Sequence, residues 1–135
     1  MSQAHEPSAP RTTLHLAAAA EFEHGLRPFF AYRDLGLKQA TGGGFGAHVI
    51  RAVPGRQVEP HWHAHDLAFQ LVYVLRGWVR FEYADVGEVL LQAGDAVYQP
   101  PRVCHRELEH SDDLELIEIT SPAEFATAPA DPPAR

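Results

Sequence analysis

The spacing of turn residues between positions 53 and 119 limits the fold more than any other feature. Short runs rich in β-branched and aromatic residues alternate with Gly, Pro and Asp about every eight to twelve positions, which is typical of antiparallel sandwiches and barrels. Within residues 78–83, Val79, Phe81 and Tyr83 occupy alternate positions. Alternate side chains of a strand share a face, so we expect these three to point inward. The pattern predicts an all-β domain.

The expected strands follow from these runs and from the turns between them. Residues 64–68 are expected to connect two strands, and Pro100-Pro101 should end another because proline cannot donate to a ladder. The strands are expected at residues 47–52, 58–63, 69–75, 78–83, 88–92, 96–99, 103–110 and 114–119. Residues 26–34 are expected to form an edge strand or an arm.

One domain is expected, because a chain of 135 residues with 45% apolar content forms a single core. We place the barrel at residues 26–120. Residues 1–25 should be an N-terminal tail or arm, with Thr12 or Thr13 capping a short helix that runs through residues 17–20 to His24. Residues 121–135, rich in Pro and Ala, are expected to be a C-terminal tail.

Charge and composition argue against several classes of partner. The formal net charge is −7 and no Lys/Arg cluster is longer than a pair, so nucleic acid is not expected. The apolar run at residues 14–20 is weak and contains His15, which indicates neither a secretory signal nor a membrane span. The single cysteine, Cys104, fits a reducing compartment and a buried structural thiol. These features predict a cytoplasmic protein.

The glycine-rich stretch 41–46 is predicted to be a flexible turn. It reads Thr-Gly-Gly-Gly-Phe-Gly and superficially resembles a phosphate-binding loop. However, no Gly-Lys-Ser/Thr follows it, and no apolar strand precedes it. We therefore expect no nucleotide site there.

A run of alternating histidines provides the chemistry. His61, His63 and His65 share strand parity, so His61 and His63 should project from one face of the strand expected at 58–63. His65 falls in the expected connection and is an alternative ligand or a proton-transfer group. Gln70 follows His63 by seven positions, an odd step, so it rejoins the histidines only if the chain turns between them.

Two stretches resemble the motifs of the cupin superfamily. The first is Gly55, five residues, His61-x-His63 and then Gln70 before the run 73–77. The second is Gly94, five residues, Pro100 and then His105. The resemblance covers roughly residues 47–120. It implies a double-stranded β-helix (jelly-roll, cupin) barrel with an N-terminal arm or short helix.

The resemblance also implies a metal centre. It makes His61, His63 and His105 the metal ligands and brings Gln70 close to the ion. Gln70 stands where cupins usually carry Glu, and a neutral amide oxygen compensates less of the charge of a divalent ion, so metal affinity should be lower. Arg102 stands where the second motif usually has Gly, so the turn before His105 must form without glycine's freedom at positive φ.

Further residues on the strand of His105 share its parity. Glu107 and Glu109 follow His105 by two and four residues, and one of them can orient a ligand. Glu107 and His65 are the candidate catalytic residues. The alternative interpretation is a hydrogen-bonded polar patch in the barrel mouth and, for the two glutamates, a solvated acidic strand end.

The expected function is that of a small metal-dependent enzyme. Three imidazoles and one oxygen leave open positions on Fe, Mn, Ni, Cu or Zn, where a small organic substrate or dioxygen can bind. Oxygenase-like chemistry is the leading expectation, and isomerase or lyase chemistry is the second. A non-catalytic binding or sensor cupin is the competing class, because no general base is clearly placed. A homodimer is also expected, since residues 69–75 are apolar on both faces.

Overall fold

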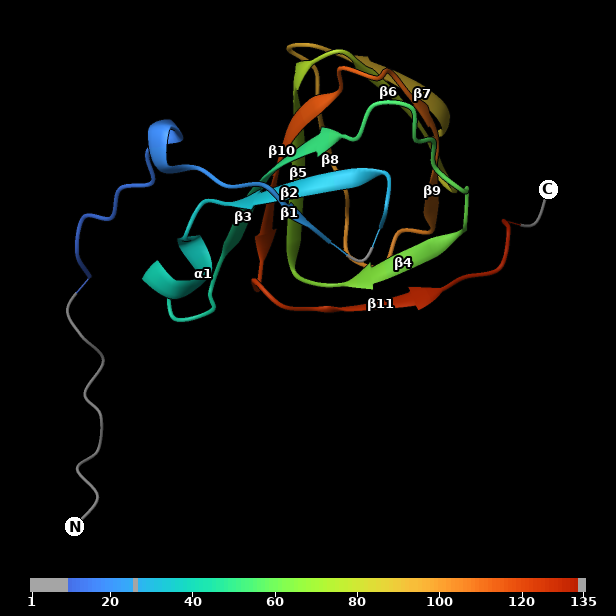
Figure 1. Ribbon diagram of the computed structural model, residues 1–135. Helices are drawn as coiled ribbons and strands as arrows, with labels where there is room; N and C mark the ends of the chain where they lie inside the picture. Colours follow the sequence, from blue (N-terminus) through green and yellow to red (C-terminus); the bar gives the residue numbers. More distant parts are fainter. Residues whose placement is uncertain (1–9, 26, 134–135) are drawn as a thin grey trace.

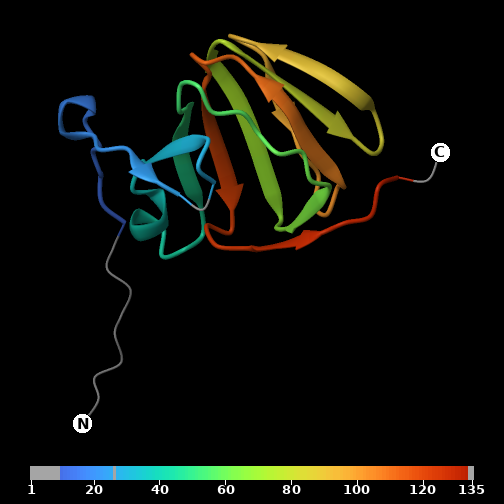
Figure 2. The same cartoon turned by 45° about the vertical axis from the view of Figure 1, so that its right-hand side comes forward.

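A computed structural model describes residues 10–25 and 27–133, which form two antiparallel β-sheets packed face to face (Figures 1 and 2). The first sheet has the order β1-β2-β3-β10-β5-β8 and the second β11-β4-β9-β6-β7. The strands of the first sheet are β1 (Glu23–His24), β2 (Phe30–Asp34), β3 (Gly46–Ala52), β10 (Glu115–Ser121), β5 (Phe69–Arg76) and β8 (Ala96–Tyr98). Those of the second are β11 (Ala126–Pro129), β4 (His63–Asp66), β9 (His105–His110), β6 (Trp78–Tyr83) and β7 (Gly87–Gln92). The all-β jelly-roll prediction is confirmed.

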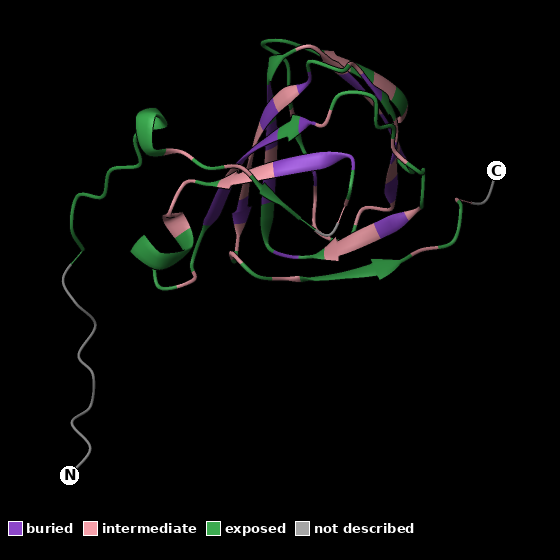
Figure 3. Ribbon diagram, viewed as in Figure 1, coloured by how far each residue is buried: buried purple, intermediate pink, exposed green. Residues whose placement is uncertain are grey.

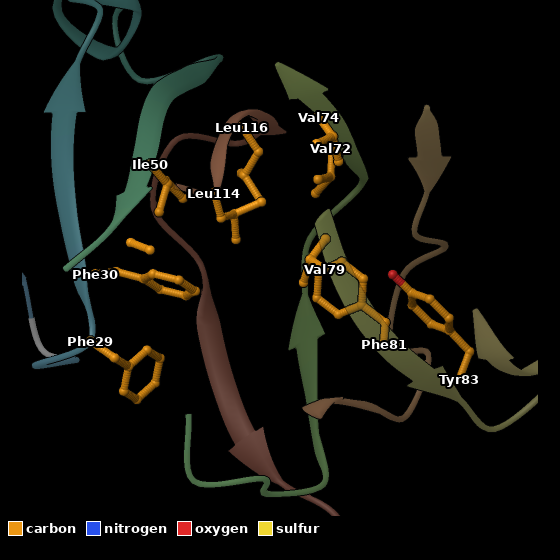
Figure 4. Packing of buried hydrophobic residues seen from close by; sticks show 11 residues of the cluster. Phe29, Phe30, Ile50, Val72, Val74, Val79, Phe81, Tyr83, Leu114 and Leu116 are labelled. Carbon is orange, nitrogen blue, oxygen red and sulfur yellow. The ribbon is translucent and has the colours of Figure 1, made fainter. Parts of the chain in front are cut away.

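The core lies between the sheets at one end of the barrel (Figure 4). Val74 of β5 and Val79 of β6 are fully buried, and Phe81 and Tyr83 also point inward, as the alternation predicts. Two aromatic side chains at the start of β2, Phe29 and Phe30, complete the cluster with ring centroids 4.8 Å apart. Several members of this cluster, among them Phe30 and Leu116, also line the interior cavity together with polar side chains.

The strand that carries the histidines begins later than the sequence predicts. Residues 58–62 are not in a strand, and the expected connection 64–68 contains most of β4, which runs from His63 to Asp66. Pro60 cannot donate a ladder hydrogen bond. The first residue with strand partners is His63, which faces His105 of β9 and Pro129 of β11. Pairing in the tertiary structure therefore sets the start of this strand.

The expected C-terminal tail contains a strand. Residues 126–129 form β11, which pairs with β4 from Ala126 opposite Asp66 to Pro129 opposite His63 (Figure 1). All four residues of β11 are exposed and rich in Ala and Pro, so no alternating apolar pattern signals a strand in the sequence. The strand exists because β4 offers it a free edge.

The N-terminal helix expected from Thr12 or Thr13 to His24 is absent from the described part of that segment. The segment instead contains a 3₁₀ turn, η1 (Ala17–Ala19), which is fully exposed (Figure 3), and the short strand β1. A helix with no apolar face to bury does not offset the cost of nucleation. The expected arm at residues 1–9 lies outside the described residues. A short helix that was not predicted, α1 (Leu37–Ala40), precedes β3. Within the described ranges, no helix has the length and apolar character needed to cross a membrane.

Candidate metal centre

Three histidines from two paired strands of the second sheet converge inside the barrel. His63 and His65 alternate on β4, and His105 begins β9 directly opposite His63. The ring centroids lie 4.3 Å apart for His63 and His105, and 5.0 Å for each pair that includes His65. One potential ligand atom from each residue lies within 4.8 Å of the others. Two nitrogens bound at about 2.1 Å to one tetrahedral ion lie about 3.4 Å apart, so the ligand atoms must approach one another by up to about 1.4 Å to share an ion.

Hydrogen bonds hold the Nδ1 side of each ring. Nδ1 of His63 donates to the backbone oxygen of His61 at 2.7 Å, and Nδ1 of His105 donates to that of Val103 at 2.9 Å. A neutral imidazole that donates through Nδ1 carries its lone pair on Nε2. Nδ1 of His65 lies 2.7 Å from the hydroxyl of Thr127 on β11. These contacts set the ring orientations and leave Nε2 of His63 and His105 available for a cation.

The structure places His61 outside this cluster. It precedes β4, its side chain is 76% exposed, and its Nε2 lies 3.8 Å from Glu59 Oε2. The sequence predicts that His61 lies with His63 and His105, but His61 does not, and His65 lies with them instead. Both pairs, His61/His63 and His63/His65, satisfy the alternation rule. Only the start of β4 at His63 decides between them.

Gln70 reaches the same cavity from the opposite sheet. It is 3% exposed on β5, whereas the sequence suggested that it could face His63 across a hairpin. Its amide hydrogen-bonds to the Glu118 carboxylate, from β10. Because the NH₂ group makes that contact, the amide oxygen is left for another partner in the cavity. Burial raises the pKa of Glu118, and the Gln70 contact offsets part of that rise.

Burial keeps the cluster uncharged. Burial, together with the neighbouring His105 and His63, lowers the pKa of His65 to about 3. Burial also lowers the pKa of His105 to about 4 and that of His63 in the same direction. Metal ligation requires neutral imidazole, so these rings are in the protonation state that binds a cation throughout the neutral pH range.

Glu107 lies in the same cavity, two residues after His105 on β9. It is 6% exposed, and its Oε2 has no hydrogen-bond partner among the described residues. Burial raises the pKa of Glu107 to about 8, and the charge of Arg27 offsets part of the rise. A carboxyl group with a pKa near neutrality can both donate and accept a proton. Glu109, the other glutamate with the same sequence parity, instead pairs with Arg80 at 3.0 Å, because the β6–β9 register shifts between Arg80 and Phe81.

Gln99 is a site residue that sequence reasoning missed. It is 2% exposed, accepts a hydrogen bond from the Tyr83 hydroxyl at 2.9 Å, and its amide nitrogen lies 3.3 Å from Nε2 of His105. The contact agrees with a lone pair on Nε2 of His105, and a metal ion bound at that nitrogen would displace the Gln99 NH₂ group. Gln99 directly follows β8 and precedes the prolines that end that run, so its position at a strand end was the available signal.

The turn before His105 forms without glycine. Arg102 adopts φ 61°, in the left-handed region, and its backbone N–H donates to the His65 backbone oxygen at 2.9 Å. The side chain adds a 3.5 Å ion pair with Asp66, both groups being largely exposed. The turn therefore fastens the end of β4 to the start of β9, and the left-handed conformation is retained despite the Cβ of arginine.

The cavity that contains these groups has a volume of about 460 Å³, within the usual range for small-molecule sites. Apolar side chains such as Phe30, Ile50, Val72 and Leu116 form its wall on the side of the first sheet. Its polar lining consists of Arg27, Tyr32, His63, His65, Gln70, Gln99, His105, Glu107, Glu118 and Thr127. A small organic molecule could therefore contact both the histidine cluster and apolar walls.

Several solved structures share this fold. An RmlC-like cupin from Shewanella frigidimarina is 24% identical, with 84% of this chain and 93% of that chain covered and a TM-score of 0.63. The polyketide cyclase RemF from Streptomyces resistomycificus is 17% identical, with 90% and 87% covered and a TM-score of 0.69. Fe(II) HppE is 14% identical, with 81% of this chain and 60% of that chain covered and a TM-score of 0.62. At these identities the likeness shows the fold alone.

The family comparison is more specific than the structural one. No curated protein sequence matches this chain. The family model described as "Cupin domain" matches residues 48–120, more than half of the chain, and this span includes every histidine of the cluster. Together with the jelly-roll fold of the described residues, this match shows that the chain belongs to the cupin domain family.

Proposed function

We propose that this chain is a small mononuclear metal-dependent enzyme that acts on a small organic molecule. The observation that carries the proposal is the convergence of His63, His65 and His105, whose ligand atoms lie within 4.8 Å of one another in a buried, uncharged cluster. Gln70 lines the same cavity and adds a neutral oxygen. The donor set of three imidazoles and one amide oxygen suits Fe, Mn, Ni, Cu or Zn.

When bound, a divalent ion with open coordination positions supplies Lewis-acid chemistry and, for a redox-active metal, a site for dioxygen activation. The chain's own residues contribute the rest. Thr127 and the backbone oxygens of His61 and Val103 hold the three rings. The apolar wall excludes water from the substrate. Glu107 lies within the cavity with an oxygen that has no partner among the residues the structure describes, and it can hold a proton for a substrate atom.

Oxygenase-like chemistry is the first candidate. The support is the open donor set and the fold shared with HppE, which was solved in its Fe(II) form. The test is the metal content of the purified protein, followed by oxygen uptake by its Fe(II) form with small catechols, diketones, thiols and hydroxy acids. Turnover should require the metal and stop with a chelator. A protein that purifies without metal, and whose stability responds neither to added ions nor to chelators, would refute the proposal.

Metal-dependent isomerase or lyase chemistry is the second candidate. Glu107 favours it, because a buried carboxyl with a pKa of about 8 suits proton transfer without a redox step. The identity of the active metal distinguishes the two candidate reactions. Zn(II) would support proton-transfer chemistry, whereas only a redox-active ion would support oxygen uptake. Binding of a ligand without any turnover, detected as a rise in melting temperature alone, would instead indicate a sensor or storage role.

A further inference from the structure

Arg27 is the one Lys or Arg side chain among the described residues that line the main cavity. It lies in the turn that leads into β2 and is half-buried. It also borders two neighbouring hollows, and His61 and His63 line both of them as well. The guanidinium is close enough to the interior for its charge to lower the pKa of the cluster histidines and of Glu107. Arg27 thus places a positive charge beside the candidate metal centre.

This charge has no protein partner within the described ranges. The Arg27 side chain makes no ion pair, hydrogen bond or ring contact there, although it is half-buried, and only its backbone oxygen accepts a hydrogen bond, from the Phe30 N–H at 3.3 Å. Six other arginines do have such partners, namely Arg33, Arg51, Arg76, Arg80, Arg102 and Arg106. A partly desolvated guanidinium without an anion is unfavourable, and its planar fork matches a carboxylate in two parallel hydrogen bonds. An anionic ligand would supply the missing partner.

We propose that Arg27 determines substrate specificity by binding the carboxylate of a small organic acid whose other end reaches the histidine cluster. The assignment rests on the proposed function in one respect, namely that the cavity holds a small-molecule substrate. It adds the chemical class of that molecule and the residue that selects it.

The remaining charges of the cavity favour a carboxylate over a phosphate. The cavity lining includes a single guanidinium, whereas a phosphate dianion carries two negative charges. A carboxylate carries one negative charge, which matches one Arg. The carbon skeleton would lie against the apolar wall that includes Phe30, Ile50 and Leu116. A compact acid fits the volume of about 460 Å³.

The test compares acids with their uncharged amides. Lactate against lactamide, benzoate against benzamide, and inorganic phosphate are titrated by calorimetry and by melting temperature into the EDTA-treated and the Zn(II)-loaded protein. We expect at least one acid, but neither amide, to bind. In R27Q the dissociation constant for that acid should rise about tenfold or more, while R27K should recover part of the loss. R76Q removes an arginine from the far end of β5 and should bind the acid like the wild type.

The following outcomes would overturn the assignment of Arg27. It fails if acids and amides bind equally, if R27Q binds the acid as tightly as R76Q does, or if phosphate binds as tightly as the acids. It fails too if neither acid binds either form of the protein. If Zn(II) does not bind while an acid still binds through Arg27, the proposed metal-dependent function fails and the role of Arg27 stands. R27K is the control for a folding defect in R27Q, because it keeps a positive charge at position 27.

Discussion

At the scale of single residues, His61 and His65 are a matched pair. They flank His63 at the same spacing, yet His65 lies in the cluster and His61 is exposed before β4. Burial rather than sequence position separates a candidate ligand from a solvated side chain. The difference can be tested directly because both residues accept the same substitution.

His65→Gln should abolish tight metal binding, whereas His61→Gln should leave it unchanged. Loss of a residue that hydrogen-bonds to a metal ligand already lowers metal affinity by about 10- to 100-fold. Loss of a ligand itself should therefore lower it by at least about 100-fold. Competition with a chromophoric chelator measures the affinity, and circular dichroism checks that both variants fold. Equal affinity in the two variants would contradict the assignment of His65.

Glu107 should make the metal-free protein less stable as the pH rises. Its folded pKa of about 8 lies above the unfolded value, so the stability it contributes is present below about pH 4.5 and is lost as the pH rises through 8. Between pH 6.5 and 8 the free energy of unfolding should fall by about 2 kcal/mol. Urea unfolding in EDTA should show this fall in the wild type and a clearly smaller one in Glu107→Gln, in which the buried Glu118 carboxyl still titrates.

The exposed neighbour Glu109 provides the control for that measurement. Its side chain is half-exposed and pairs with Arg80 at the surface. Glu109→Gln should therefore keep the wild-type fall above pH 6.5. If the free energy of unfolding of Glu109→Gln did not change with pH, or if it fell as much in Glu107→Gln as in the wild type, another group would be responsible for the fall.

At the scale of elements, the turn between β8 and β9 joins the two halves of the site. Arg102 in this turn hydrogen-bonds to the backbone of His65 and precedes His105 by three residues. A left-handed conformation is costly for a residue with a Cβ, and glycine adopts it freely. The turn keeps its shape because it hydrogen-bonds to β4 and continues directly into β9.

Arg102→Gly should stabilise the protein by about 0.5–1 kcal/mol, because relief of the strained φ exceeds the added entropy of the unfolded chain. The lost ion pair with Asp66 is exposed and contributes little. Thermal unfolding measures the change. Arg102→Ala is the matched control, since it removes the same ion pair and keeps the strain. A stabilisation of similar size in both variants would contradict the explanation.

At the scale of the whole molecule, the outer face of the first sheet carries an apolar patch. It is formed by Phe69, Tyr73 and Leu75 of β5 with Tyr98 of β8, each at least 36% exposed, and the rings of Phe69 and Tyr98 lie 5.9 Å apart. Contiguous apolar surface of this kind is typical of protein interfaces. A second copy of the chain remains the predicted partner, since β5 is apolar on both faces.

Tyr73→Glu should shift the protein from dimer to monomer. The substitution places a charge within the patch of each copy, where burial against the partner would desolvate it. Sedimentation velocity at micromolar concentration measures the oligomeric state. Leu90→Glu is the control, because Leu90 is similarly exposed on β7, in the other sheet. A wild-type protein that sediments as a strict monomer would contradict the dimer.

Much of the fold follows from local pattern. The run 78–83 appears as β6 with the predicted residue bounds, and Val79, Phe81 and Tyr83 face the core. Alternation along a strand is a local property, so it can be recognised without tertiary contacts. The convergence of His63 and His105 was also expected, but from the resemblance to the cupin motifs.

The remaining features were decided by tertiary structure. By itself the sequence determined the all-β barrel, its inward faces and a cluster of histidines within it. Only the folded chain decided that His65 rather than His61 faces His105, that residues 126–129 form a strand, and that Arg27, Gln99 and Glu118 line the same cavity. The physical reason is that each of these depends on which edge pairs with which, and pairing partners far apart in the chain leave no local periodicity.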